Sequence, residues 1–310
     1  MNPIALQFAG GNGFFAGCAL IALACAAVAF SGPRLSVLWR IAMIIGAIFV
    51  AVSSIPLPVW LYAPWALAVV VTIVVATGKP ARPKWARAAE VIGLALTIVA
   101  AAWEVPNVIM PHISGGHQAR IVVIGDSLTA GMNDGTKTWP DLLAEKHRLD
   151  IFSLAQPGLR LDGAAEIARG MPPAPQGRRT VAILEIGGND VFGGASDDEF
   201  ERCLGQLLTL VSARVDTVVL LELPLPPFRN RLAAIQRRLA RDHKAILVPK
   251  RAYTEVIGTP DATVDGLHLS KSGQRLMAQM MLRILDAIED SPEAGKAAGR
   301  SNSLDDSTGR

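Results

Sequence analysis

Charge is scarce in the first third of the chain. Residues 1–113 carry eight Asp, Glu, Lys or Arg side chains, although the whole 310-residue chain has 30 basic and 27 acidic ones. The 51% hydrophobic content excludes a disordered protein, because disordered chains are poor in apolar residues. Residues 114–310 have an ordinary share of charge for a soluble domain. We therefore expect a membrane part at residues 1–113, followed by a globular part.

Cysteine and net charge are low as well. Cys18, Cys25 and Cys203 are the three cysteines, and their spacing indicates neither a disulfide framework nor a zinc site. The net charge of +3 is too small to predict a nucleic-acid partner. We therefore expect neither a metal site nor nucleic-acid binding.

Four long apolar segments lie in the first part, at residues 14–30, 37–55, 59–77 and 88–109. Each approaches the roughly 20 apolar residues that cross a bilayer. The first segment has a possible earlier start near Ile4, and Glu104 interrupts the fourth. We expect Glu104 at the membrane interface. A cleaved signal peptide is disfavoured, because no Lys or Arg precedes Arg34 and three more apolar segments follow.

Basic residues predict the orientation of these segments. They lie in or next to the first and third connecting loops, at Arg34, Arg40, Lys79, Arg82, Lys84 and Arg87. Such loops face the cytoplasm. Four spans would then place everything after residue 110 on the outer side, periplasmic or extracellular. If the fourth segment does not span, the globular part lies in the cytoplasm instead.

The globular part alternates short apolar runs with amphipathic stretches. The runs predict strands at residues 120–124, 150–155, 180–186, 217–223 and 245–248. The stretches between them predict helices at residues 139–147, 161–169, 198–213, 230–242 and 272–288. This alternation is typical of a three-layer α/β domain with a mostly parallel five-stranded sheet. We place the domain at residues 114–290 and a disordered tail at residues 291–310.

Residues able to do chemistry follow the predicted strands. Ser127 follows the first strand and opens a helix, and Asn189 follows the third. Gly158, after the second strand, can present a bare backbone N–H. Asp265 and His268 are three residues apart, so that one loop presents both. A serine becomes a nucleophile when a histidine oriented by an acid takes its proton.

These residues resemble the sequence blocks of the SGNH hydrolases, the GDSL esterases and lipases. The matching residues are Gly125-Asp126-Ser127-Leu128, Gly158, Gly187-Gly188-Asn189-Asp190, and Asp265 with His268. The resemblance covers about residues 118–288 and implies a flavodoxin-like three-layer fold. Ser153 departs from the pattern, because an Asn often stands there. We interpret Asp126 and Asp190 as residues that brace the turns of Ser127 and Asn189.

The resemblance implies a role for each site residue. Ser127 would be the nucleophile, His268 the base and Asp265 the residue that orients it. The oxyanion hole would comprise Ser127, Gly158 and Asn189, and no metal or organic cofactor is required. Phe192 and Phe228 are candidates for acyl contacts, although both would also suit the core or a rim.

We therefore predict a membrane-anchored serine hydrolase that cleaves carboxylic esters, with membrane lipids as its surroundings. The ester would belong to a lipid or to an O-acylated glycan. One alternative is an O-acyltransferase acting on a cell-envelope glycan, and another is a non-catalytic membrane protein with a decayed hydrolase domain. A transporter is disfavoured, because the apolar segments carry few polar residues.

Overall fold

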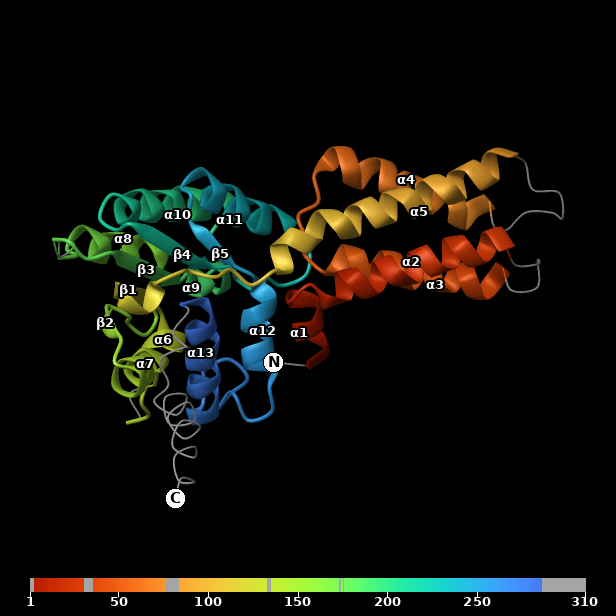
Figure 1. Cartoon of the computed structure of the whole chain (residues 1–310). Coiled ribbons are helices and arrows are strands. Elements are labelled where there is room, and N and C mark those ends of the chain that lie inside the picture. The colour runs from red at the N-terminus through yellow and green to blue at the C-terminus, as the bar shows by residue number, and fades with distance from the viewer. Residues whose placement is uncertain are drawn as a thin grey trace, which may run out of the picture.

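A computed structural model describes residues 3–30, 36–75, 84–132, 135–172, 174 and 176–285. Its α/β domain contains a five-stranded parallel sheet in the order β2-β1-β3-β4-β5 (Figure 1). The strands are β1 (Arg120–Gly125), β2 (Asp150–Ser153), β3 (Thr180–Glu185), β4 (Thr217–Leu221) and β5 (Ile246–Val248). The predicted α/β class and parallel five-stranded sheet are confirmed.

Helices cover both faces of this sheet. Alternate strand residues such as Ile121 and Val122 enter two separate cores, because successive side chains of a strand point to opposite faces. The Ile121 core includes residues of α7 (Trp139–His147), α12 (Lys250–Gly258) and α13 (Lys271–Ile284). The Val122 core includes residues of α8 (Leu161–Arg169), α10 (Asp197–Ser212) and α11 (Asn230–Asp242). These three layers agree with the sequence prediction.

Three short helices of the domain were not among the helices that we predicted between strands. These are α6 (Ser127–Ala130), α9 (Gly188–Phe192) and α12. α6 agrees with the expectation that Ser127 opens a helix. The last described helix, α13, ends at Ile284, and the predicted tail at residues 291–310 lies outside the described residues.

A bundle of four helices extends from one side of the domain (Figure 1). It comprises α2 (Asn12–Phe30), α3 (Ser36–Val52), α4 (Val59–Val75) and α5 (Lys84–Glu104), which match the four apolar segments. Within the described residues, one helical stretch, Arg87–Val108, is long and apolar enough to cross a membrane, and three apolar stretches are shorter. Four membrane spans are therefore not confirmed. Arg34, Lys79 and Arg82, on which the orientation depends, lie outside the described residues.

The bundle is joined to the α/β domain by a buried ion-pair network. Glu104, at the end of α5, accepts two hydrogen bonds of 2.7 Å from the guanidinium of Arg237 on α11. The same guanidinium donates to Glu222, which follows β4, at 2.7 Å. Glu104 is 1% exposed. The acid that interrupts the fourth apolar segment thus has a partner in the neighbouring domain.

The first described helix, α1 (Pro3–Ala9), is separate from α2. Gly10 and Gly11 form the turn between them, and Gly11 has a φ of +91°, which favours glycine. Leu6 is buried in the core that contains α12 and α13. At Gly10, a Cβ would lie 2.3 Å from Oγ1 of Thr254 on α12. α1 therefore packs against the α/β domain, although it precedes the bundle in the sequence.

Candidate active site

The sheet order brings three strand ends together. β1 lies between β2 and β3, so the loops that follow these three strands are neighbours. They carry Ser127, Gly158 and Asn189 respectively. Carboxyl ends of parallel strands are the usual position of ligand sites in such sheets. The predicted residues after β1, β2 and β3 therefore share one edge of the sheet.

Asp265 and His268 reach Ser127 from the loop before α13. Nε2 of His268 lies 3.1 Å from Oγ of Ser127, and Nδ1 lies 2.6 Å from Oδ2 of Asp265. An antiparallel bridge between Thr263 and Leu269 closes the loop that carries both residues. The three side chains thus form a continuous hydrogen-bonded chain from serine to carboxylate.

Asp265 is held by three hydrogen bonds. Besides the His268 ring, its carboxylate accepts from the backbone N–H groups of Leu267 and His268, at 2.9 and 2.8 Å. The bond to the His268 ring and the two backbone bonds lower the pKa of Asp265 below its ordinary value. The carboxylate is consequently ionised near neutral pH and oriented toward the imidazole.

Two backbone N–H groups are available near Oγ of Ser127. Among the described residues, no hydrogen bond uses the N–H of Ser127 or that of Gly158. Ser127 is the first residue of α6, where N–H groups have no partner within the helix. Gly158 has a φ of +73°, and a Cβ there would meet no atom within 4 Å.

The Asn189 amide is already occupied. Its Nδ2 donates to the carbonyl of Leu159 at 2.9 Å and to Oδ2 of Asp126 at 3.3 Å. The Leu159 bond ties the Gly158 loop to α9. An amide nitrogen has two hydrogens, so Asn189 must exchange one of these bonds to donate to a substrate.

Asp126 and Asp190 brace the turns, as predicted. Asp126 caps α6 by accepting from the N–H of Leu128 at 3.0 Å. Asp190 accepts from the N–H of Leu161 at 3.0 Å and from Nε of Arg160 at 3.5 Å. Asp190 therefore connects α9 to the start of α8.

A buried acid below the Ser127 turn was not predicted. Glu185, the last residue of β3, accepts from Thr129 at 2.9 Å and from the Tyr253 hydroxyl at 3.2 Å. Burial raises the pKa of Glu185 well above its ordinary value, and the charge of Asp126 raises it further. Burial also raises the pKa of Asp126. The sequence indicates only that an acidic residue ends an apolar strand. It does not reveal the partners of Glu185, because Thr129 and Tyr253 are 56 and 68 positions away.

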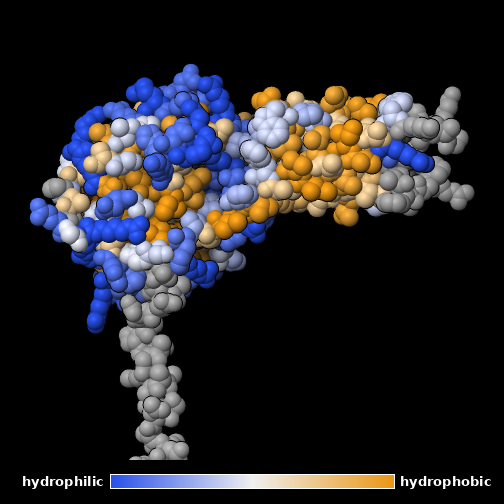
Figure 2. Space-filling model, turned by 45° about the horizontal axis from the view of Figure 1, so that its top comes forward, coloured by the Kyte–Doolittle hydropathy of each residue, from blue (hydrophilic) through white to orange (hydrophobic). Residues whose placement is uncertain are grey.

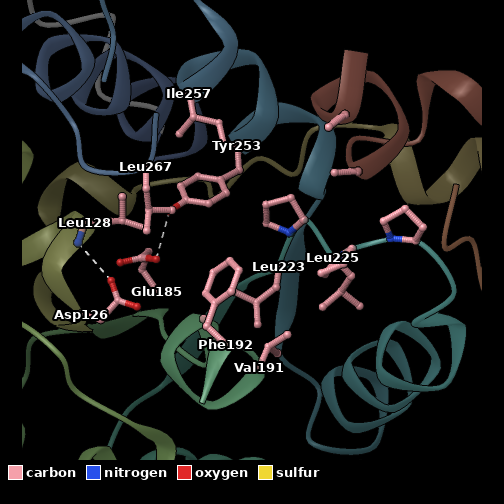
Figure 3. Close-up of a pocket in the computed structure, with 16 residues that line it drawn as sticks. Asp126, Leu128, Glu185, Val191, Phe192, Leu223, Leu225, Tyr253, Ile257 and Leu267 are labelled. Atoms are coloured by element: carbon pink, nitrogen blue, oxygen red, sulfur yellow. Dashed lines mark hydrogen bonds between the residues drawn. The ribbon is translucent and has the colours of Figure 1, made fainter. Parts of the chain in front are cut away.

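An apolar cavity of about 260 Å³ lies beside the turn that contains Ser127 (Figure 3). Its lining residues include Leu128, Gly188 and Leu267, which are chain neighbours of Ser127, Asn189 and His268. Phe192 lines the cavity and is 68% exposed. Phe228, the other predicted acyl contact, is exposed and is not among the lining residues. The structure therefore brings Phe192, and not Phe228, next to the cavity.

A parallel α/β domain of this kind, with a serine after β1 hydrogen-bonded to a histidine that is in turn hydrogen-bonded to an aspartate, defines a serine hydrolase that acts on esters. Residues 123–276, within this domain, match the GDSL-like Lipase/Acylhydrolase family.

Curated proteins and solved structures are also similar to part of the chain. One is the thioesterase 1/protease 1/lysophospholipase L1 of Escherichia coli (strain K12), which is 26% identical over 178 residues, covering 54% of this chain and 84% of the relative. Another is the esterase TesA of Pseudomonas aeruginosa, which is 23% identical over 165 residues, covering 50% and 81%. Among solved structures, the psychrotrophic esterase EstA of Pseudoalteromonas sp. has a TM-score of 0.46 at 22% identity, covering 54% of this chain and 97% of EstA.

Proposed function

We propose that this ester hydrolase is anchored in a membrane and works through an acyl-Ser127 intermediate. The observation that carries the mechanism is the hydrogen-bonded chain from Ser127 Oγ through His268 to Asp265, at 3.1 and 2.6 Å. Such a chain supplies the base that a serine nucleophile needs. The ionised Asp265 keeps the Nδ1 proton on His268, so that Nε2 is the basic nitrogen.

Acylation begins when Nε2 of His268 takes the proton of Ser127 and Oγ bonds to the ester carbonyl carbon. The carbonyl oxygen becomes an oxyanion, which accepts from the N–H groups of Ser127 and Gly158. Preorganised donors of this kind stabilise the transition state. When the C–O bond to the alcohol breaks, His268 returns its proton to the leaving oxygen.

In deacylation, water is the attacking group and Ser127 is the leaving group. A water molecule gives its proton to His268 and attacks the acyl carbon, and the bond to Oγ of Ser127 then breaks. Ser127 regains its proton from His268, and the acid product leaves. Asn189 becomes a third oxyanion donor by exchanging its 3.3 Å bond to Asp126 for the oxyanion and keeping the shorter bond to Leu159.

The surface of the bundle supports membrane anchoring. Figure 2 shows an apolar surface over the bundle and a more hydrophilic one over the α/β domain. Large apolar side chains more than 50% exposed occur on α3, α4 and α5, among them Leu38, Ile48, Trp60, Val70 and Ile92. Monomeric soluble proteins rarely expose contiguous apolar areas of this extent. With basic loops in the cytoplasm, the catalytic domain would lie on the outer side.

Labelling with a fluorescent fluorophosphonate tests mechanism and orientation together. We expect the wild-type chain to be labelled in intact cells and the Ser127→Ala variant to remain unlabelled at equal expression. Labelling only in permeabilised cells would keep the mechanism and reverse the orientation. Equal labelling of Ser127→Ala would refute the assignment of the nucleophile.

A further inference from the structure

One wall of the apolar cavity comes from outside the family domain. Ala5 and Ala9 of α1 line the cavity, although the family match begins at residue 123. Figure 3 shows this helix as the reddish ribbon beside the cavity. Leu6 of the same helix is buried in the domain core, which fixes α1 in this position. One side of the cavity is therefore formed by a segment that lies outside the family match.

The cavity also extends from the Ser127 turn toward the bundle. At one end its lining residues flank Ser127 and His268, and at the other they include Pro226. The carbonyl of Pro226 accepts a hydrogen bond of 2.6 Å from Ser54, in the connection between α3 and α4. A chain attached at Ser127 would consequently extend toward the apolar bundle.

The chemistry of the lining indicates the occupant. Apart from Asp126, Glu185 and Tyr253, the lining side chains are apolar. Two of these polar groups are joined to each other, since the Tyr253 hydroxyl donates to Glu185 at 3.2 Å. An acyl chain brings no polar group that needs a partner, and the volume of 260 Å³ lies just below the range of about 300–1,000 Å³ for sites of drug-sized ligands.

We propose that this cavity holds the acyl chain of the ester and that α1 is the element that sets the length of that chain. The natural substrate is then a medium-chain acyl ester and not an acetyl ester. The proposal rests on the proposed function, because the acyl carbonyl must reach Ser127. Each buried methylene should raise kcat/KM about fourfold.

The test compares two substitutions on α1 in the full chain. Ala5 and Ile4 are both exposed, but only Ala5 lines the cavity. Ala5→Trp therefore places an indole at the cavity wall, whereas Ile4→Trp adds the same group at the neighbouring position, which does not line it. The substrates are p-nitrophenyl octanoate and p-nitrophenyl acetate. The acetate reaction serves as the internal control for folding and for the triad.

We expect Ala5→Trp to lower kcat/KM for octanoate about tenfold or more, because loss of two buried methylenes already gives that factor. Acetate hydrolysis should change less than about twofold, and Ile4→Trp should affect neither substrate. An unchanged octanoate-to-acetate ratio in Ala5→Trp would overturn the proposal, as would the same change of ratio in Ile4→Trp. Equal loss of both rates would assign α1 a structural role only. If the Ser127→Ala variant hydrolysed p-nitrophenyl acetate at the wild-type rate, the proposed function itself would be refuted.

Discussion

The structure contains two contacts between an acidic and a basic side chain that have nearly the same length but differ in their exposure to solvent. His268 and Asp265 are 2.6 Å apart, with side chains 22% and 50% exposed. Arg237 and Glu104 are 2.7 Å apart, with side chains 12% and 1% exposed. Exposed pairs contribute little to stability, whereas removal of one partner of a buried pair leaves an uncompensated charge. We infer that the first contact serves chemistry and that the second holds the bundle to the α/β domain.

The largest effect is expected on catalysis, from Asp265→Asn. An amide nitrogen facing Nδ1 favours the wrong tautomer of His268, so kcat should fall about 10⁴-fold. The free energy of unfolding should change by no more than about 1 kcal/mol, because the pair is exposed. Steady-state kinetics and thermal unfolding of the full chain measure both quantities. A kcat within tenfold of wild type would remove Asp265 from the mechanism.

Arg237→Ala is expected to lower the stability of the protein and to leave its activity largely unchanged. This substitution leaves Glu104 and Glu222 buried without their cation and should cost about 3–5 kcal/mol of unfolding free energy. The kcat of the folded fraction should stay near that of wild type, because Arg237 lies outside the hydrogen-bonded chain of Ser127. Chemical denaturation in detergent gives the stability.

A second substitution sharpens this expectation. Glu104→Gln in the Arg237→Ala background removes one of the stranded charges, so it should recover part of the lost stability. No recovery would show that the cost of Arg237→Ala comes from lost packing and not from buried charge.

The same contrast explains what the sequence could predict. Ser127, Asn189, Asp265 and His268 carry recognisable chemistry, and adjacent strands of a parallel sheet bring the loops of Ser127 and Asn189 together. The Arg237–Glu104 contact joins residues 133 positions apart, and neither has a local pattern that specifies the other. Packing between distant segments decides such contacts, and the sequence of one segment does not reveal them.

Local length explains other differences. α9 has five residues, too few to show helical periodicity, and is therefore not among the predicted helices. Glu104 interrupts the fourth apolar segment, yet this segment lies in the 22-residue stretch Arg87–Val108, which is long enough to span a membrane. A helix continues through polar residues such as Arg87, so a count of apolar residues underestimates its length. The sequence does not indicate that Ala5 and Ala9 line a cavity, because alanine is common in helices of every kind.

The pH dependence of stability should reveal the titration of Glu185, the buried acid below the site. The pKa of Glu185 is raised above its ordinary value of 4.5, chiefly by burial. The folded state therefore keeps a proton that the unfolded chain loses. This contribution is complete below about pH 4.5 and is lost as the pH rises toward the folded pKa.

The corresponding variant is Glu185→Gln, which is neutral at every pH and similar in shape. It should flatten the decline of stability above pH 4.5, which in wild type is at most about 1.4 kcal/mol per pH unit for one group. Thermal unfolding of both chains over a pH series measures the slopes. Parallel curves for the two chains would contradict the assignment of the proton to Glu185.

The smallest effect is expected one residue away from Arg237. Arg238 on the same helix contacts Glu201 at 2.8 Å, but these side chains are 43% and 37% exposed. Arg238→Ala should therefore cost at most about 1 kcal/mol, and less at high salt, because exposed pairs are screened. Arg237→Ala and Arg238→Ala remove the same side chain from adjacent positions of α11, so a difference in unfolding free energy reports burial and charge compensation. Equal costs would mean that exposure does not separate the two kinds of contact, and the structural role of the Glu104–Arg237 pair would then have to be abandoned.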